Sequence, residues 1–370
     1  MKTWKFYLIT LSVCCLPIAL QSECGPPSKP FLESYSFIQP AIVDPNAPGA
    51  PYFLDFDVLL EEYGRQDRNQ IEENVAEWQD RYCQVASQNM IYQLIYQTPL
   101  YDLREFVSSI RSKQSPLPIN LRSNTFAAYL KRNRCEEMAE YLVFAKRCEP
   151  YVTEVNAWEL KSDNEDRMRA LIQEGLDRFL DLKSHYIRLR YAYQLVRLAH
   201  YLKDFKGTLD LYDYLMPKID NDPSILEDWI LGHKAGALMA IGQTTEANYL
   251  FSTIFENSHG KRESAFNSFQ IPTQQEWNDV LLLCKDDKER ATIFALRANA
   301  QNAKPLDDMK EVFRLDPESP HLNILLIKEL KRLEKNLLGL EFNPKKRQNQ
   351  QYYNIPKPGI GAYIIELQEF

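Results

Sequence analysis

The chain has 370 residues, of which 45% are hydrophobic, and it carries a formal net charge of −7. A chain of this length and composition can bury one large core or two ordinary ones. Its 12 glycines argue against glycine-rich phosphate loops and turn-dense β-architectures, and its acidic balance argues against nucleic-acid binding, which requires a basic surface.

The N-terminus has the pattern of a secretory signal peptide. Two lysines lie close to the start, and residues 6–20 form a mostly apolar run, which is short for a membrane-spanning helix of about 20 residues. We assign residues 1–22 to this signal, which predicts export to the periplasm, the outer membrane or the cell surface. Cys24 follows the expected cleavage site and is a candidate for lipidation, although Glu23 stands where a lipobox has a small residue. No later stretch is long and apolar enough to span a membrane.

Residues 23–62 are predicted to form an extended lead. Seven prolines occur between positions 24 and 51, and proline disfavours helix interiors because it lacks the backbone N–H. Aromatic residues in this segment would anchor it to the folded body.

Residues 63–340 are predicted to form a helical-repeat domain, because apolar residues recur there at spacings of three and four. Several helix starts are marked. Thr273 and Glu276 form a capping box, Ser184 precedes a long run at 185–202, and Pro320 stands at a first helical position. Prolines mark several breaks in the pattern, and the helices between breaks are mostly about 10–20 residues long with short connections, which is typical of antiparallel helix pairs.

One half-repeat is well preserved. Gly242 is followed by Ala247, Phe251 and Ile254, which match the turn glycine, the small residue and the two packing residues of the second half of a tetratricopeptide repeat. Weaker copies place Thr208 and Met138 in the small-residue position.

Because of these residues, the chain resembles the tetratricopeptide-like α-solenoids over about positions 120–338. A signal peptide followed by Cys-Gly-Pro and irregular helical hairpins also resembles exported proteins of Bacteroidota. The expected fold is therefore all-α, an irregular antiparallel array of helix hairpins behind a proline-rich lead. The alternative is a non-repetitive helical bundle that obeys the same packing rules.

No motif for catalysis, metal binding or cofactor binding is found. The five histidines form no HExxH pattern, no GxSxG occurs, and the cysteines form no CxxC. His200 and His233 are expected to line helix contacts, and Cys284 is expected to be a buried apolar residue. Cys135 and Cys148 lie about 20 Å apart on one predicted helix and cannot pair with each other unless that helix is broken; a disulfide framework is not indicated, and a single bridge elsewhere stays open. The plentiful carboxylates between positions 163 and 222 are interpreted as mostly solvated helix faces.

A candidate binding surface is predicted on two helices, at 185–202 and 224–241. It combines aromatic and basic side chains, which are enriched at binding surfaces; the alternative for this set is core packing. Its members are Tyr186, Arg190, Tyr193, Arg197 and Trp229.

The leading functional hypothesis is a non-enzymatic scaffold that binds a protein or peptide partner in the cell envelope. The first alternative is a glycan-binding protein of the outer membrane, because a SusD-like protein also combines tetratricopeptide helices with an N-terminal cysteine. The second is an exported helical enzyme that cleaves glycans with paired carboxylates. The remaining residues, 341–370, form a polar tail whose last apolar run, AYIIELQEF, is consistent with a strand or a sheet edge.

Overall fold

The structure is a computed structural model that describes residues 70–112, 114–152, 162–220, 222–299, 303–338 and 358–370. The predicted signal peptide, Cys24 and the proline-rich lead lie outside these ranges. The chain divides into two units, residues 43–330 with 359–370 and residues 1–42 with 331–358. The described residues belong almost entirely to the first unit, and the following description concerns that unit.

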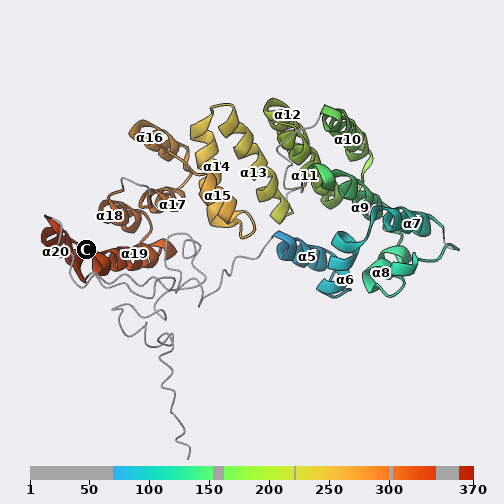
Figure 1. The fold of residues 1–370 in the computed structure, drawn as a ribbon, viewed down its shortest axis with the longest axis horizontal. Helices are drawn as coiled ribbons and strands as arrows, with labels where there is room; N and C mark the ends of the chain where they lie inside the picture. The colour runs from blue at the N-terminus through green and yellow to red at the C-terminus, as the bar shows by residue number, and fades with distance from the viewer. Residues whose placement is uncertain (1–69, 113, 153–161, 221, 300–302, 339–357) are drawn as a thin grey trace, which may run out of the picture. The chain divides into compact units, whose positions relative to one another are not determined.

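All regular secondary structure in the described ranges is helical (Figure 1), which confirms the predicted all-α class. None of the helices in those ranges combines the length and the apolar character that crossing a membrane requires. The α-helices are α5 (Gln70–Arg81), α6 (Gln88–Tyr92), α7 (Leu100–Arg111), α8 (Thr125–Arg132), α9 (Glu136–Cys148), α10 (Ser162–Asp181), α11 (His185–Tyr201), α12 (Phe205–Leu215), α13 (Ile225–Ala240), α14 (Thr244–Asn257), α15 (Arg262–Ser268), α16 (Gln274–Leu283), α17 (Asp287–Arg297), α18 (Pro305–Leu315), α19 (Pro320–Leu338) and α20 (Ile360–Glu369).

The helix starts that the sequence marks are confirmed. The Ser184 side chain accepts a hydrogen bond from the backbone N–H of Ile187 at the start of α11. Thr273 and Glu276 form the reciprocal capping box of α16, and Pro320 begins α19. Each device satisfies or removes a backbone N–H that the first helical turn leaves without a partner.

The C-terminal apolar run is a helix, α20, so the expectation of a strand or an edge was wrong. The positions of α20 that are not exposed are Ile360, Tyr363, Ile364 and Leu367. They recur at spacings of three, one and three, which is the period of one helix face. The helix also has a partner. Glu366 Oε1 lies 2.6 Å from Lys310 Nζ of α18, and the ring of Phe370 contacts that of Phe313 edge-on at 6.0 Å.

Three hairpins share one turn. They connect α8 to α9, α11 to α12 and α13 to α14, and their central residues, Arg134, Lys203 and Gly242, have φ of 54°, 60° and 85°. In each, the next backbone N–H donates to the carbonyl five residues earlier, at 3.0, 3.0 and 2.9 Å. This left-handed cap closes a helix C-terminus, and glycine adopts it without steric cost whereas arginine and lysine do not.

The shared turn defines the small-residue position of the repeat. Five residues after each central residue stand Ala139, Thr208 and Ala247, and all three are 0% exposed. The sequence-based choice of Met138 for this position was therefore wrong by one residue, because Arg134 hides the turn that glycine would mark. Phe251 and Ile254 are buried beyond Ala247. Residues 134, 203 and 242 are 69 and 39 positions apart, so the fold is repeat-like with irregular spacing.

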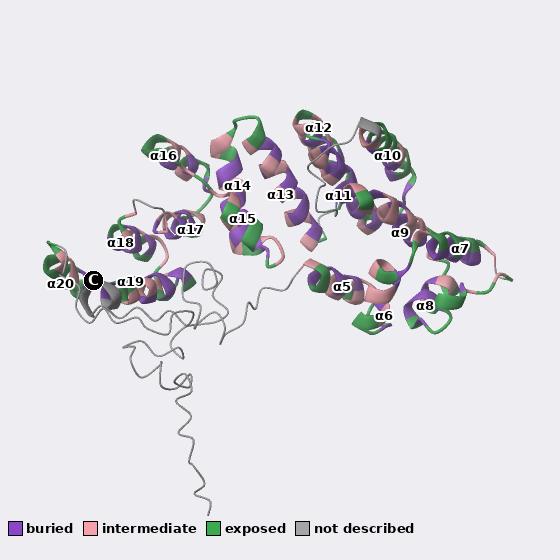
Figure 2. Ribbon diagram, in the orientation of Figure 1, coloured by how far each residue is buried: buried purple, intermediate pink, exposed green. Residues whose placement is uncertain are grey.

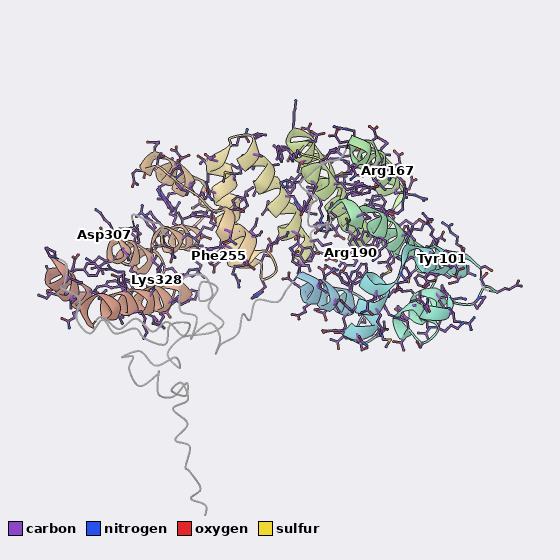
Figure 3. All side chains as sticks on the ribbon, in the orientation of Figure 1. Tyr101, Arg167, Arg190, Phe255, Asp307 and Lys328 are labelled. Carbon is purple, nitrogen blue, oxygen red and sulfur yellow. The ribbon has the colours of Figure 1, made fainter. Side chains whose placement is uncertain are left out.

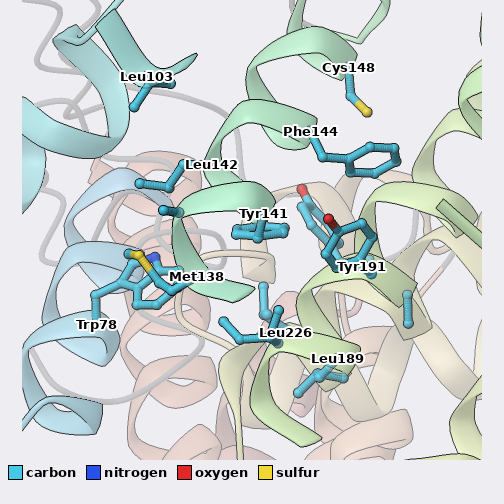
Figure 4. Packing of buried hydrophobic residues seen from close by; sticks show 14 of the residues in the cluster. Trp78, Leu103, Met138, Tyr141, Leu142, Phe144, Cys148, Leu189, Tyr191 and Leu226 are labelled. Atoms are coloured by element: carbon cyan, nitrogen blue, oxygen red, sulfur yellow. The ribbon is translucent and has the colours of Figure 1, made fainter. Parts of the chain in front are cut away.

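Helix α11 is the centre of the larger core. It packs against α9, α10, α12 and α13, and 11 of its 17 residues are buried, as the purple ribbon in Figure 2 shows. A helix that is buried on several sides needs apolar residues all round. Aromatic rings fill the contact with α9, where Tyr191 stacks on Phe144 at 4.7 Å and meets Tyr141 edge-on at 5.5 Å (Figure 4).

A smaller cluster joins α16 and α17. It consists of Trp277, Val280, Cys284 and Ile293, so the expected burial of Cys284 is confirmed. Among the described cysteines, Cys135 and Cys148 lie at opposite ends of α9 and neither forms a disulfide.

The shared small-residue position yields the first prediction. We expect Ala139→Leu and Ala247→Leu each to lower the free energy of unfolding by about 1–3 kcal/mol, because the added atoms enter a closed helix contact. Ala170→Leu, at an exposed position of α10, is the control and should change it by less than about 0.5 kcal/mol. Urea denaturation measures all three. Equal stability of Ala247→Leu and the control would contradict the assignment.

Candidate interaction site

The sequence-predicted surface on α11 and α13 is an interior contact in this structure. Its five residues do lie together. The ring of Tyr193 contacts that of Trp229 at 5.5 Å, and the guanidinium carbons of Arg197 and Arg190 lie over the rings of Tyr193 and Tyr186. However, Arg190, Tyr193 and Trp229 are buried, because helix α5 covers this side of α11. The set is therefore not an open face.

Arg190, labelled in Figure 3, is 2% exposed and lies in the contact with α5. Its guanidinium carbon lies 3.8 Å from the centroid of the Trp78 ring. Its nitrogens donate to Asn74 Oδ1 at 2.7 Å and to Glu77 Oε2 at 2.9 Å. Burying a charge is costly unless charged and polar partners satisfy it, and α5 supplies both kinds of partner as well as a cation–π contact.

Glu77 joins three helices. One carboxylate oxygen accepts from Arg190 and from the Tyr186 hydroxyl of α11. The other accepts from the Ser224 hydroxyl at 2.5 Å and from the backbone N–H of Ile225 at 3.2 Å, at the N-terminus of α13. A negative charge at that end also interacts favourably with the helix dipole.

Sequence reasoning missed Asn74 and Glu77. The available signal was weak: two polar residues three apart, beside the apolar stripe of Val75 and Trp78.

A second contact joins α5 to α13 one turn earlier. Glu73 Oε2 accepts from Trp229 Nε1 at 3.3 Å, and burial raises the pKa of the Glu73 carboxyl.

His200 and His233 form a pair between α11 and α13; each was expected at a helix contact, but their pairing was not predicted. The rings of His200 and His233 are 5.1 Å apart, and a side chain at Gly236 would come within 2.8 Å of His200 Cε1. Burial lowers the pKa of His200 to about 4. Burial, together with the positive charges of Lys261 and Arg197 and the neighbouring His200, lowers the pKa of His233 well below its usual value.

The open side of α11 carries a groove of about 610 Å³ between α10 and α12. Its lining includes Ala199 of α11 and Gly207 of α12, which have little or no side chain. Apolar side chains line both walls: Ile172, Leu176 and Leu180 from α10, and Leu211 and Tyr214 from α12. Leu180 is 56% exposed and Tyr214 is 45% exposed, so apolar surface faces solvent at the mouth.

Carboxylates surround the same groove. Asp177, Asp204 and Asp210 are among its lining residues, and Arg169 is its single cation. Asp204 is engaged on both oxygens, because one accepts from the backbone N–H of Gly207 at 2.9 Å and the other lies 3.6 Å from Arg169 Nη1. The sequence showed many acids between positions 163 and 222, but spacing along the chain could not show which would face one another.

Among the described residues, no group of three or more His, Cys, Asp and Glu side chains could hold a metal ion. Comparison with protein-family models, with curated proteins and with solved structures found no match for the chain.

The Arg190 contact yields the second prediction. Arg190→Met should lower the free energy of unfolding by about 3 kcal/mol or more, because it leaves the carboxylate of Glu77 buried without its cation. The control Arg167→Met removes an exposed arginine of α10 and should change stability by less than about 0.5 kcal/mol. Chemical denaturation followed by tryptophan fluorescence measures both. A loss below about 1 kcal/mol for Arg190→Met would contradict a structural role for the pair.

The histidine pair yields a pH prediction. Both folded-state pKa values lie below that of an unfolded histidine, so the unfolded chain binds more protons and stability falls as the pH decreases from about 6.5 to about 4. Raised pKa values of Glu73 and Asp228, the latter to about 6, act in the opposite direction. A variant that keeps these carboxyls therefore separates the two effects.

His233→Gln is that variant. Between pH 7 and about pH 4.5 the native chain should lose about 2 kcal/mol of unfolding free energy relative to His233→Gln. The reason is that the imidazole of His233 stays neutral in the folded chain but takes up a proton in the unfolded chain, whereas glutamine does not titrate. Urea denaturation at a series of pH values gives the difference. A constant difference across the range would show that His233 does not couple folding to pH.

Proposed function

We propose that the protein is an exported, non-enzymatic helical-repeat scaffold that binds a segment of a partner protein. The observation that carries this proposal is the α10–α12 groove, where apolar walls stay open to solvent at Leu180 and Tyr214. Contiguous exposed apolar surface with a polar rim is typical of protein-binding sites.

The repeat-like architecture supports the same function. Arrays of helix hairpins use surfaces formed by successive helices to bind peptides and proteins, and the turn geometry at Gly242 together with the small residue Ala247 supports a tetratricopeptide-like relationship. The proposed location is the cell envelope, after removal of a signal peptide at residues 1–22, with Cys24 as the proposed lipid anchor.

The scaffold is favoured over a glycan-binding protein for a structural reason. Sugars commonly stack on open aromatic faces, whereas Tyr193 and Trp229 are buried and Tyr186 packs against Trp78 at 5.1 Å. The aromatic set that suggested a glycan site is thus occupied by α5.

Affinity capture from an envelope extract tests the proposal. The groove variant Leu180→Ser/Tyr214→Ser is compared with Leu282→Ser/Tyr101→Ser, which removes the same two residue types at positions that are 82% and 68% exposed elsewhere. We expect a partner protein to be retained by the native chain and by the control, and to be reduced at least about tenfold by the groove variant, since each lost apolar contact is worth about 1–2 kcal/mol. Equal retention by both variants, or binding to a polysaccharide array instead of a protein, would contradict the proposal.

A further inference from the structure

We propose that the partner segment in the α10–α12 groove is a cationic amphipathic helix of two to three turns. This inference rests on the proposed function and adds the chemistry of the partner. The shape of the groove indicates a helix, and the charges around it indicate the sign.

The apolar wall on α10 has the repeat of a helix-binding ridge. Ile172, Leu176 and Leu180 are spaced by four residues, so they form one row that extends over eight residues, or about 12 Å. Both α10 and α12 pack on α11, whose Ala199 is among the lining residues. An amphipathic helix would lay its apolar stripe, recurring every three to four residues, along this trough.

The small lining residues give the groove its depth. A Cβ at position 207 would come within 2.7 Å of the Asp204 carboxylate, which caps α12 through the backbone N–H of Gly207, so a side chain there would displace the cap. Ala199 contributes only a methyl group. Side chains of leucine size on the incoming helix can therefore reach α11.

The free charges of the groove are negative and lie on both walls. Asp177 belongs to α10 and Asp210 to α12; both are exposed, and neither forms an ion pair with a described residue. Asp177 accepts only from the neighbouring amide of Gln173, at 3.0 Å. By contrast, the single lining cation, Arg169, is already paired with Asp204.

A helix with basic residues on both flanks of its apolar stripe would meet one aspartate on each side. The electrostatic term is modest for exposed pairs, and it acts mainly on specificity and on the association rate. An acidic helix of the same shape would instead be repelled from both walls. The groove therefore discriminates by charge as well as by shape.

Two synthetic helices test this inference against the full chain. The first is an 18-residue peptide with leucine at every third or fourth position and lysine on both flanks of the leucine stripe. The second has glutamate in place of every lysine. Fluorescence anisotropy gives both affinities at low and at high salt, and we expect the lysine helix to bind at least about tenfold more tightly, with an affinity that falls as salt screens the rim charges.

Two double variants identify the charges responsible. Asp177→Asn/Asp210→Asn should weaken the lysine helix about fivefold and reduce its salt dependence, consistent with two exposed pairs. Glu246→Gln/Asp307→Asn removes two exposed acids from α14 and α18 and should change the affinity by less than about twofold. Circular dichroism checks that both variants remain folded.

Three outcomes would overturn the inference. The first is equal affinity for the two helices, and the second is no effect of Asp177→Asn/Asp210→Asn on the affinity for the lysine helix. The third is a concentration-dependent dimer of the native chain that Leu180→Ser/Tyr214→Ser abolishes, because a second copy of the chain would then occupy the groove. The two proposals can fail separately. If the lysine helix does not bind while a partner protein is still captured through the groove, the cationic class is wrong and the scaffold stands.

Discussion

The carboxylate of Glu77, whose side chain is 10% exposed, is the constraint on which the arrangement of α5, α11 and α13 depends. A carboxylate in an apolar interior must be satisfied on both oxygens, and here one oxygen is satisfied by Arg190 and the other by the start of α13. Residue 77 is 113 positions from one partner and 148 from the other. The Glu77 side chain thus links α5 to α11 and α13, which are distant in the sequence. The hairpin turns, by contrast, connect each helix only to the next one along the chain.

This contact determines which surface is available for binding. With α5 seated over Arg190 and Trp229, one side of α11 becomes interior, and α9 and α13 cover two more. The remaining side lies between α10 and α12, where Ala199 is reached only past the groove walls. Aromatic and basic side chains thus stabilise the inner side of α11, and aliphatic and acidic side chains line the proposed binding face between α10 and α12.

Local features of the fold could be predicted from the sequence, and long-range polar contacts could not. The helix caps at Ser184 and Thr273 and the turn at Gly242 depend only on residues nearby in the sequence, so they can be recognised from the sequence alone. The equivalent turns at Arg134 and Lys203 carry no glycine. Thr208 was still placed correctly after Lys203, but the missing glycine at 134 led to the one-residue error at Met138. The tyrosines and arginines of α11 suggested a binding face, because nothing near Arg190 in the sequence revealed that α5 would supply its counter-charge. The groove was missed for the same reason: its acids lie on two helices that meet only through α11.

Hydrogen–deuterium exchange of the full chain, with and without the lysine-flanked amphipathic helix, tests most directly that binding occurs on the α10–α12 side while α5 remains seated. Slower exchange is expected in residues 172–180 and 205–214, with no change in residues 70–81. Faster exchange in α5, together with protection of the α11 and α13 side that it covers, would contradict the account, because the partner would then displace α5 and bind the face that Glu77 and Arg190 close.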